Sequence, residues 1–342
     1  MFRSKQKKDE IQGAETLTNL KLNALRTLST KPTNFQQVYF LTPFKNDKIL
    51  IVTSKHNEIS SPIISLINLI TSKMIQKTLI KSGFVTQQLF SAHLNLFFTC
   101  TSDRYIKLWT CPSFRSAGEI EHPKKVLDFV QIEGTDFLAS CGFFSGIYLW
   151  NVRLGQQGEI LRSKDDSCFD KLNYIAKYDW IIGVEHNVVH VFDWKGKQQK
   201  YVFAAHGALA VTLIEYYPKI DRFLLQYMNG ETHNIKYHED KGFESVWKIP
   251  DQYGFVKESF LLENRYLIMV MVNKPAQVFD CVNAKKLGTI SIYHNERIAY
   301  LQKRQMLLVF NPHTRRMRFF LERKTPPKTG CFAAFSDIYI CY

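Results

Sequence analysis

The 342-residue sequence lacks the features that would place it in several large classes of protein. It has no C-x-x-C pair, and its seven cysteines are scattered and odd in number, which argues against a disulfide framework or a cysteine zinc site. No apolar run approaches the ~18 residues of a membrane-spanning helix. The best candidate, residues 266–272, ends at Asn273-Lys274-Pro275. We therefore expect no membrane insertion and a reducing compartment, either cytoplasmic or nuclear.

Catalytic and metal-binding motifs are also missing. None of the patterns G-x-S-x-G, H-E-x-x-H, G-x-x-x-x-G-K-[ST] or G-x-G-x-x-G occurs. His186 and His190 flank a strand-like segment, and His233 and His238 lie near Glu231, but histidines in such settings are usually solvated or structurally hydrogen-bonded. We predict that the protein is not an enzyme and that it holds no metal ion or cofactor.

Negative charge is scarce: 45 Lys and Arg residues stand against 31 Asp and Glu residues, a net charge of +14. An excess of this size favours an anionic partner, which could be nucleic acid, an acidic protein surface or lipid headgroups.

The sequence does contain an internal repeat. Short segments that end in a bulky residue recur, as in YIKLWT at residues 105–110 and GIYLWN at residues 146–151. The bulky marker positions are Ile67, Trp109, Trp150, Phe192, Tyr237, Phe279 and Phe320. They are separated by 42, 41, 42, 45, 42 and 41 residues, which is the spacing of a repeat architecture.

Each repeat contains about four β-prone segments of 4–8 residues, bounded by Asn, Gly, Asp, Ser or Pro. A single four-stranded sheet cannot bury either face alone, whereas sheets stacked around an axis bury both. The sequence therefore predicts an all-β fold, a seven-bladed β-propeller of four-stranded antiparallel blades spanning residues 35–342. Residues 1–34 are expected to form a basic N-terminal arm. Either residues 24–29 or residues 331–335 would close the last blade, since an unpaired apolar edge invites aggregation.

The segment Ser102-Asp103-Arg104-Tyr105-Ile106-Lys107-Leu108-Trp109 resembles the S-D-x-T-I-x-L-W motif of the WD-repeat (WD40) family, and the resemblance covers about residues 35–342. His122 with Val126 resembles the Gly-His and valine of the following repeat. The resemblance implies a propeller whose blades are held by hydrogen-bonded Asp, His, Ser and Trp. At the position of Asp103 the other blades carry Ser61, Phe144, His186, Glu231, Asn273 and Thr314. No blade has the full set, and we expect aromatic packing to replace it.

Basic residues gather in two parts of the chain. Residues 301–328 carry a net charge of +7, and the first eight residues add +4. The candidate residues for binding an anionic partner are Arg3, Lys5, Lys7, Lys8, Lys303, Arg304, Arg315, Arg323, Lys324 and Lys328. If both ends of the chain meet at the last blade, the two groups share one side of the ring. The alternative is that they are ordinary solvated faces.

These observations favour a non-enzymatic protein-interaction scaffold within a multi-subunit assembly. WD-repeat proteins resembling this one occur in axonemal and other cytoskeletal assemblies, ribosome biogenesis, vesicle coats and ubiquitin ligases. Among these we favour a microtubule-associated or ciliary complex in the cytoplasm, because a basic ring suits acidic, tubulin-like surfaces. The alternative is an RNA-binding or ribonucleoprotein-associated propeller in the nucleus or nucleolus that uses the basic last blade. An active site in the axial channel is a third hypothesis without a supporting motif.

Overall fold

Every regular element in the described part of the chain is a β-strand. The computed structural model describes residues 24–30, 38–44, 48–55, 58–68, 74–80, 83–143, 146–161, 168–204, 210–218, 220–250, 254–262, 266–301, 306–311, 316–321 and 338–340. The strands belong to two compact units: Asn34–Gln252, here the larger unit, and Met1–Thr33 with Tyr253–Tyr342, here the smaller unit.

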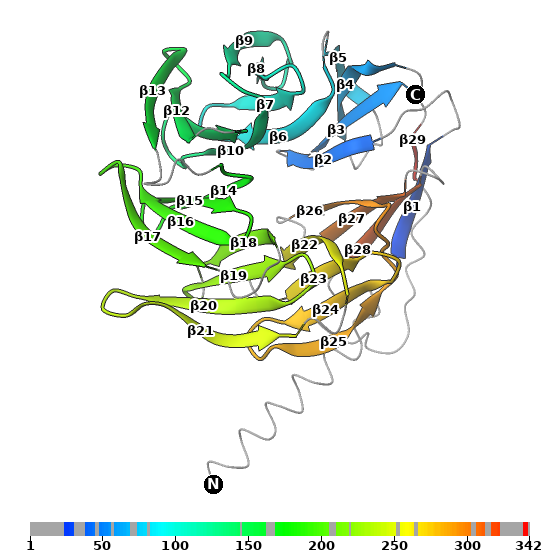
Figure 1. The fold of residues 1–342 in the computed structure, drawn as a ribbon. Helices are drawn as coiled ribbons and strands as arrows, with labels where there is room; N and C mark the ends of the chain where they lie inside the picture. The colour runs from blue at the N-terminus through cyan, green and yellow to red at the C-terminus, as the bar shows by residue number, and fades with distance from the viewer. Residues whose placement is uncertain are drawn as a thin grey trace. The chain divides into compact units, whose positions relative to one another are not determined.

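The larger unit contains five antiparallel four-stranded sheets among its described residues, and each sheet uses four strands that are consecutive in sequence. In Figure 1 these sheets follow one another in chain order from blue to yellow-green. The first two sheets are β2 (Val38–Phe44), β3 (Lys48–Lys55), β4 (Glu58–Asn68), β5 (Met74–Leu79), then β6 (Val85–Ser91), β7 (Leu96–Thr101), β8 (Tyr105–Thr110), β9 (Ser116–Glu121). The other three are β10 (Val126–Gln131), β11 (Phe137–Gly142), β12 (Ile147–Asn151), β13 (Gln156–Leu161); β14 (Lys171–Ile175), β15 (Trp180–Glu185), β16 (Val188–Asp193), β17 (Gln198–Ala204); and β18 (Val211–Tyr217), β19 (Arg222–Tyr227), β20 (Thr232–His238), β21 (Gly242–Ile249).

The smaller unit contains two sheets. One is four-stranded and antiparallel: β22 (Val256–Leu262), β23 (Tyr266–Met271), β24 (Ala276–Asp280) and β25 (Lys285–Ile290). The other combines β26 (Arg297–Leu301), β27 (Met306–Asn311) and β28 (Arg316–Leu321) with β1 (Ala24–Thr30) and β29 (Ile338–Ile340), in the order β26-β27-β28-β1-β29. β1 pairs antiparallel with β28, and β29 pairs parallel with the far edge of β1. The segment at residues 24–29 is thus a strand of the last sheet. The other candidate for that role, residues 331–335, lies outside the described residues. The fifth strand was not predicted, and it covers an edge that would otherwise be unpaired.

The marker residues all lie on the third strand of their sheets, and the pairing defines their position. Ile67, Trp109, Trp150, Phe192, Phe279 and Phe320 each pair with the second residue of the preceding strand. In the sheet β18–β21 that second residue is Phe223, and it pairs with Ile235. Tyr237 therefore lies two residues beyond the equivalent position, and the marker of this sheet is Ile235. With this correction the two flanking intervals become 43 and 44 residues instead of 45 and 42.

A β-bulge recurs beside these markers. In all six four-stranded sheets of the described chain, the register between the third and fourth strands shifts next to the marker. The fourth strand is an edge strand of each of these sheets. A bulge twists such an edge and interrupts its row of hydrogen-bonding groups, so it hinders pairing with another chain.

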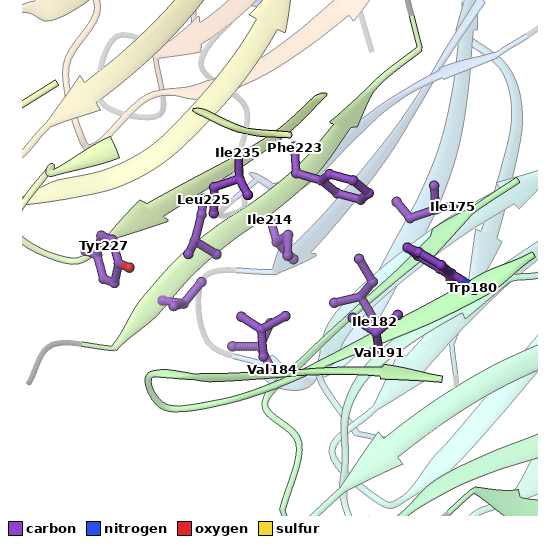
Figure 2. Packing of buried hydrophobic residues seen from close by; sticks show 12 residues of the cluster. Ile175, Trp180, Ile182, Val184, Val191, Ile214, Phe223, Leu225, Tyr227 and Ile235 are labelled. Atoms are coloured by element: carbon purple, nitrogen blue, oxygen red, sulfur yellow. The ribbon is translucent and has the colours of Figure 1, made fainter. Parts of the chain in front are cut away.

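The hydrophobic core lies between consecutive sheets. The cluster in Figure 2 joins the sheets β14–β17 and β18–β21, with Trp180 and Val191 from the first and Phe223 and Ile235 from the second. Comparable clusters join each of the other neighbouring pairs of sheets within the larger unit, and one joins β23–β24 to β26–β27 in the smaller unit. Apolar residues on both faces of each sheet are buried in this way, which explains the nearly continuous apolar runs of the second strands.

The segment that leads into β14 packs so closely on the neighbouring strand β15 of the same sheet that one position requires glycine. A Cβ atom added to Gly183 on β15 would lie 2.6 Å from Cδ1 of Phe169, a residue that is fully buried. Real Cβ atoms do not approach a ring carbon so closely, so the neighbouring ring occupies the space that a side chain would need.

Candidate interaction surfaces

The ten basic residues predicted to bind an anionic partner all lie outside the described residues. The division into units nevertheless shows where the chain's charge is concentrated. The smaller unit has 21 Lys and Arg against nine Asp and Glu, a net charge of +12, and the larger unit has 24 against 22, a net charge of +2. Nearly all of the excess positive charge therefore belongs to the smaller unit.

Asp103 occupies the turn between β7 and β8. Its carboxylate accepts a hydrogen bond from Thr101 Oγ1 and forms an ion pair with Lys107, with a distance of 3.4 Å between Asp103 Oδ2 and Lys107 Nζ. These contacts are with the last residue of β7 and with a residue of β8, within one sheet. They stabilise the local chain and do not join sheets.

Part of the hydrogen-bonded set implied by the WD-repeat resemblance is present. Trp109 Nε1 donates to Thr99 Oγ1 at 2.9 Å, and Trp150 Nε1 donates to Ser140 Oγ at 2.7 Å, both in buried positions that link the second and third strands. His122 is fully buried, and its ring Nδ1 lies 2.7 Å from the carbonyl oxygen of Lys124. Burial lowers the pKa of His122, which favours the neutral ring. The ring also packs edge-on against Tyr148 with centroids 4.7 Å apart.

A buried carboxylate that we did not predict as a site residue ties three sheets together. Asp128 on β10 accepts hydrogen bonds from Gln87 Nε2 on β6 at 2.7 Å and from the backbone N–H of Leu172 on β14 at 2.9 Å. It also accepts one from the N–H of Phe129 at 2.9 Å. Burial raises the pKa of the Asp128 carboxyl, and the charge of Lys171 and the three hydrogen bonds oppose that rise.

Similar polar links join the first strands of the remaining sheets of the larger unit, where these strands lie side by side. Gln88 Nε2 on β6 donates to Thr42 Oγ1 on β2. Asn173 Nδ2 on β14 donates to the carbonyl oxygen of Ile214 on β18 at 2.6 Å. Together with Asp128, these bonds connect all five first strands of the larger unit in sequence.

A second recurring feature lies in the turns that precede the second strands. Asn95, Asp136, Asp179 and Asp221 each stand immediately before β7, β11, β15 and β19. We call these four side chains the turn clasps. Three of them bind the turn between the third and fourth strands of their own sheet: Asn95 Nδ2 donates to the carbonyl oxygen of Cys111 at 2.7 Å, Asp136 Oδ1 pairs with Arg153 Nε at 3.0 Å, and Asp179 Oδ2 pairs with Lys195 Nζ at 2.6 Å.

The fourth turn clasp bonds to its own sheet and to the neighbouring one, as Asp136 also does through His93 Nε2, which lies 3.3 Å from Asp136 Oδ1. Asp221 accepts hydrogen bonds from the hydroxyls of Tyr178 at 2.9 Å and Tyr216 at 2.6 Å, and pairs with Lys177 Nζ at 2.6 Å. Burial would raise the pKa of this carboxyl, but the bonds from Lys177 and the two tyrosines outweigh it and hold the pKa below its usual value. The sequence offered a signal for this feature, since a side chain of Asp or Asn directly precedes the apolar run in consecutive repeats.

Exposed apolar side chains are concentrated at one end of the strands. Of twelve large hydrophobic residues that are exposed in the described chain, six lie in the loops leading into first strands or in the turns between second and third strands. In the larger unit these are Phe84, Phe143 and Met228, and in the smaller unit they are Phe255, Val272 and Tyr293. Because they occupy loops of equivalent position in their own sheets, these loops are candidate binding segments within each unit.

Comparison with known proteins identifies the architecture. No protein-family model matches the sequence, and no curated protein matches it. A solved structure does: the crystal structure of the β-propeller domain of Cps50 (Swd1) from Myceliophteria thermophila aligns with a TM-score of 0.69, covering 84% of this chain and 96% of that one at 12% identity. The chain is a β-propeller. Its blades are the four-stranded antiparallel sheets described above, so the predicted propeller fold is confirmed. The similarity of this propeller to Swd1 concerns the fold alone, because 12% identity transfers no binding residue.

The described part of the propeller shows neither a metal-binding cluster nor a membrane-spanning helix. Within the described residues, no group of three or more His, Cys, Asp or Glu side chains is placed to hold a metal ion. The same residues include no helix that is long and apolar enough to cross a membrane.

Proposed function

We propose that this propeller is a non-enzymatic scaffold that holds one or more proteins within a larger assembly. The observation that carries the proposal is that each unit exposes large apolar side chains on loops at equivalent ends of its strands, such as Phe255 at 60% exposure in the smaller unit and Phe143 at 47% in the larger unit. Large apolar side chains gathered on exposed loops are typical of protein-binding surfaces. The rigid sheets beneath them supply a fixed frame for such loops.

We also propose that the seven sheets form a ring of seven blades in which β1 completes the last blade. The regular interval between markers supports this arrangement, as does the pairing of β1 with β28. Cryo-electron microscopy of the protein in its assembly would count the blades directly. A ring of six or eight blades would contradict the proposal.

Within this function we favour a microtubule-associated or ciliary assembly in the cytoplasm. The support is the net charge of +12 in the smaller unit, which suits an acidic protein surface such as that of tubulin. Co-sedimentation with purified microtubules at rising salt concentration tests this setting. Binding that is absent even at low salt would remove the cytoskeletal proposal and leave the scaffold proposal intact.

The same charge supports a second candidate, an RNA-binding or ribonucleoprotein-associated propeller in the nucleus or nucleolus. In that case replacing Arg315, Arg323, Lys324 and Lys328 with Gln should weaken binding to unrelated RNA sequences about equally. Binding should fall with salt, with a log–log slope of about −0.7 per phosphate contact on single strands. Unchanged RNA affinity in the quadruple variant would end this proposal.

Affinity capture separates the two functions. We would capture the tagged full-length protein from its own cells, with and without ribonuclease, and identify its partners by mass spectrometry. The scaffold proposal predicts a stoichiometric set of proteins that survives ribonuclease. Partners that disappear with ribonuclease would move the RNA function to first place, and release of product from a small-molecule substrate by the purified protein would refute the non-enzymatic proposal.

A further inference from the structure

Three exposed apolar residues of the smaller unit lie on segments that are joined to one another. Phe255 precedes β22, Val272 follows β23 and Tyr293 lies between β25 and β26, with exposures of 60%, 39% and 44%. The N–H of Val272 donates to the carbonyl oxygen of Phe255 at 2.9 Å, which places these two residues side by side.

The loop that carries Tyr293 is held against the same two strands. The N–H of Asn273 donates to His294 Nδ1 at 3.5 Å, and Lys257 Nζ donates to the carbonyl oxygen of His294. Glu296, which is buried, accepts from the N–H of Tyr293 at 3.1 Å and from Asn311 Nδ2 at 3.0 Å. The three segments that carry these exposed side chains are therefore bonded to one another.

Two lysines, Lys257 and Lys274, lie beside these segments. Lys257 and Lys274 are both exposed, and Lys274 Nζ would lie 3.8 Å from a Cβ atom added to Gly254, the residue before Phe255. Partial burial and then the charge of Arg297 lower the pKa of Lys257, so a carboxylate bound nearby would favour its charged form. We call Phe255, Val272, Tyr293, Lys257 and Lys274 the Phe255 patch.

We propose that the Phe255 patch binds an acidic peptide segment of a partner protein, one that carries at least one large apolar side chain. The inference rests on the proposed scaffold function and names the surface and the partner chemistry. An apolar centre with a charged rim is the usual anatomy of a protein interface. The partner is acidic because the patch belongs to a unit with a net charge of +12. A peptide fits better than single-stranded RNA, since Val272 offers a nucleobase no stacking face whereas it packs against an apolar peptide side chain.

Fluorescence anisotropy with a defined probe tests the proposal. The probe is a labelled twelve-residue peptide of Glu and Asp with Phe and Leu at its centre, and the comparison probes are the same peptide with Lys in place of each acid and a twelve-nucleotide oligo(U). Full-length protein should bind the acidic peptide in preference to both. The double variant K257E/K274E should weaken binding about tenfold, and F255S/Y293S should weaken it by at least about tenfold.

Matched controls come from the same unit. Lys285 and Lys286 on β25 are exposed, so K285E/K286E makes the same change of charge away from the patch. Val282 has an exposure of 47%, so V282S removes a comparable exposed apolar side chain. Both controls should bind within about twofold of the wild type, because charge alone acts weakly at a distance in salt. All variants alter exposed side chains, and circular dichroism melts establish that each one is folded.

Each outcome gives a decision. The proposal is overturned if the wild type does not bind the acidic peptide at about 1 mM, if the patch variants bind like the controls, or if the oligo(U) binds and only its binding is lost in the patch variants. Affinity capture with the patch variants distinguishes failure of the Phe255 patch proposal from failure of the scaffold proposal. If all stoichiometric partners are retained, the scaffold function stands and the patch does not. If the wild type captures no protein, the scaffold function itself fails.

Discussion

Replacing Asp128 offers the sharpest test of how the sheets of the larger unit are held together. The Asp128 carboxylate accepts hydrogen bonds from two neighbouring sheets as well as from its own strand. Removing the side chain would leave the N–H of Leu172 and the amide of Gln87 without this acceptor in a buried position. The loss would therefore act between sheets, where most of the core is also buried.

The expected cost follows from these contacts. A hydrogen bond to a charged group contributes about 1.5–3 kcal/mol, and the desolvation of the carboxylate offsets part of the total. Asp128→Ala should therefore lower the free energy of unfolding by about 3–5 kcal/mol, a large share of the 5–15 kcal/mol typical of a folded domain. Asp128→Asn keeps one acceptor oxygen and should cost about 1–2 kcal/mol. The double variant with Gln87→Ala should show a coupling energy of about 1–2 kcal/mol.

Tryptophan fluorescence is a suitable assay because all five tryptophans, at positions 109, 150, 180, 194 and 247, belong to the larger unit. Urea unfolding followed by this signal reports on that unit. The matched control is Gln131→Ala on the same strand. Among the described residues, the Gln131 side chain donates within its own sheet, to the carbonyl oxygen of Thr135 at 3.2 Å. This variant should lower the free energy of unfolding by less than about 1 kcal/mol. If Asp128→Ala unfolds at the same urea concentration as the wild type, the three-sheet link has no energetic role and the reasoning is refuted.

Three further predictions concern single positions. Burial raises the pKa of Glu215 on β18 to about 7, so the wild type should lose stability as pH rises from about 4.5 through 7. Glu215→Gln should abolish that loss and gain at most about 3 kcal/mol of unfolding free energy at pH 8. Melting temperatures of both proteins across this pH range check the sign, and parallel curves would contradict it. Gly183→Ala should lower the free energy of unfolding by about 2–3 kcal/mol because the new methyl group meets a buried ring. In the control Gly288→Ala the new methyl group meets no atom within 4 Å, and stability should change by less than about 0.5 kcal/mol. Equal melting temperatures for the two variants would show that the ring can move aside. Asp179 has a φ of +55° and binds Lys195 and the hydroxyl of Tyr174. In urea unfolding, Asp179→Ala should therefore lower the free energy of unfolding by about 2 kcal/mol, and Asp179→Asn by less than about 1 kcal/mol. The reverse order would mean that neither the backbone conformation nor the acceptor matters at this position.

The repeat could be predicted from the sequence because several markers are buried between two sheets at the same position of their strands, as Trp109, Trp150 and Phe192 are. The fifth copy shows where this reasoning stops. In the segment NIKYHE, Ile235 and Tyr237 point to the same face of β20 and both contact the same core. When two apolar side chains of one strand point to the same face, hydrophobicity alone does not show which of them occupies the marker position. Only the pairing of Ile235 with Phe223 and the bulge beside it identify the marker.

The polar hydrogen bonds that link neighbouring sheets were not predicted from the sequence. Asp128 stands in an apolar segment, VLDFVQ, and its partners Gln87 and Leu172 lie 41 and 44 residues away. Those separations are about one repeat on either side, so partners at this spacing were open to inference. Which polar residue bonds which backbone group depends on the distance between sheets, and that distance is set by packing rather than by local sequence. The turn clasps show the same limit, since Asp136 and Asp221 occupy equivalent positions and bind different partners.

The pairing of β1 with β28 has a consequence for how the chain is made. Residues 24–30 leave the ribosome early, but their partner, residues 316–321, is synthesised almost 300 residues later. Until then β1 has no sheet to join, while the blades of the larger unit can form from strands that are adjacent in sequence. Pairing of such distant segments carries the largest loop-closure cost in the fold and comes late. During synthesis the early strand therefore stays without its β28 partner until residues 316–321 are made, and over that interval it is available to pair with other chains.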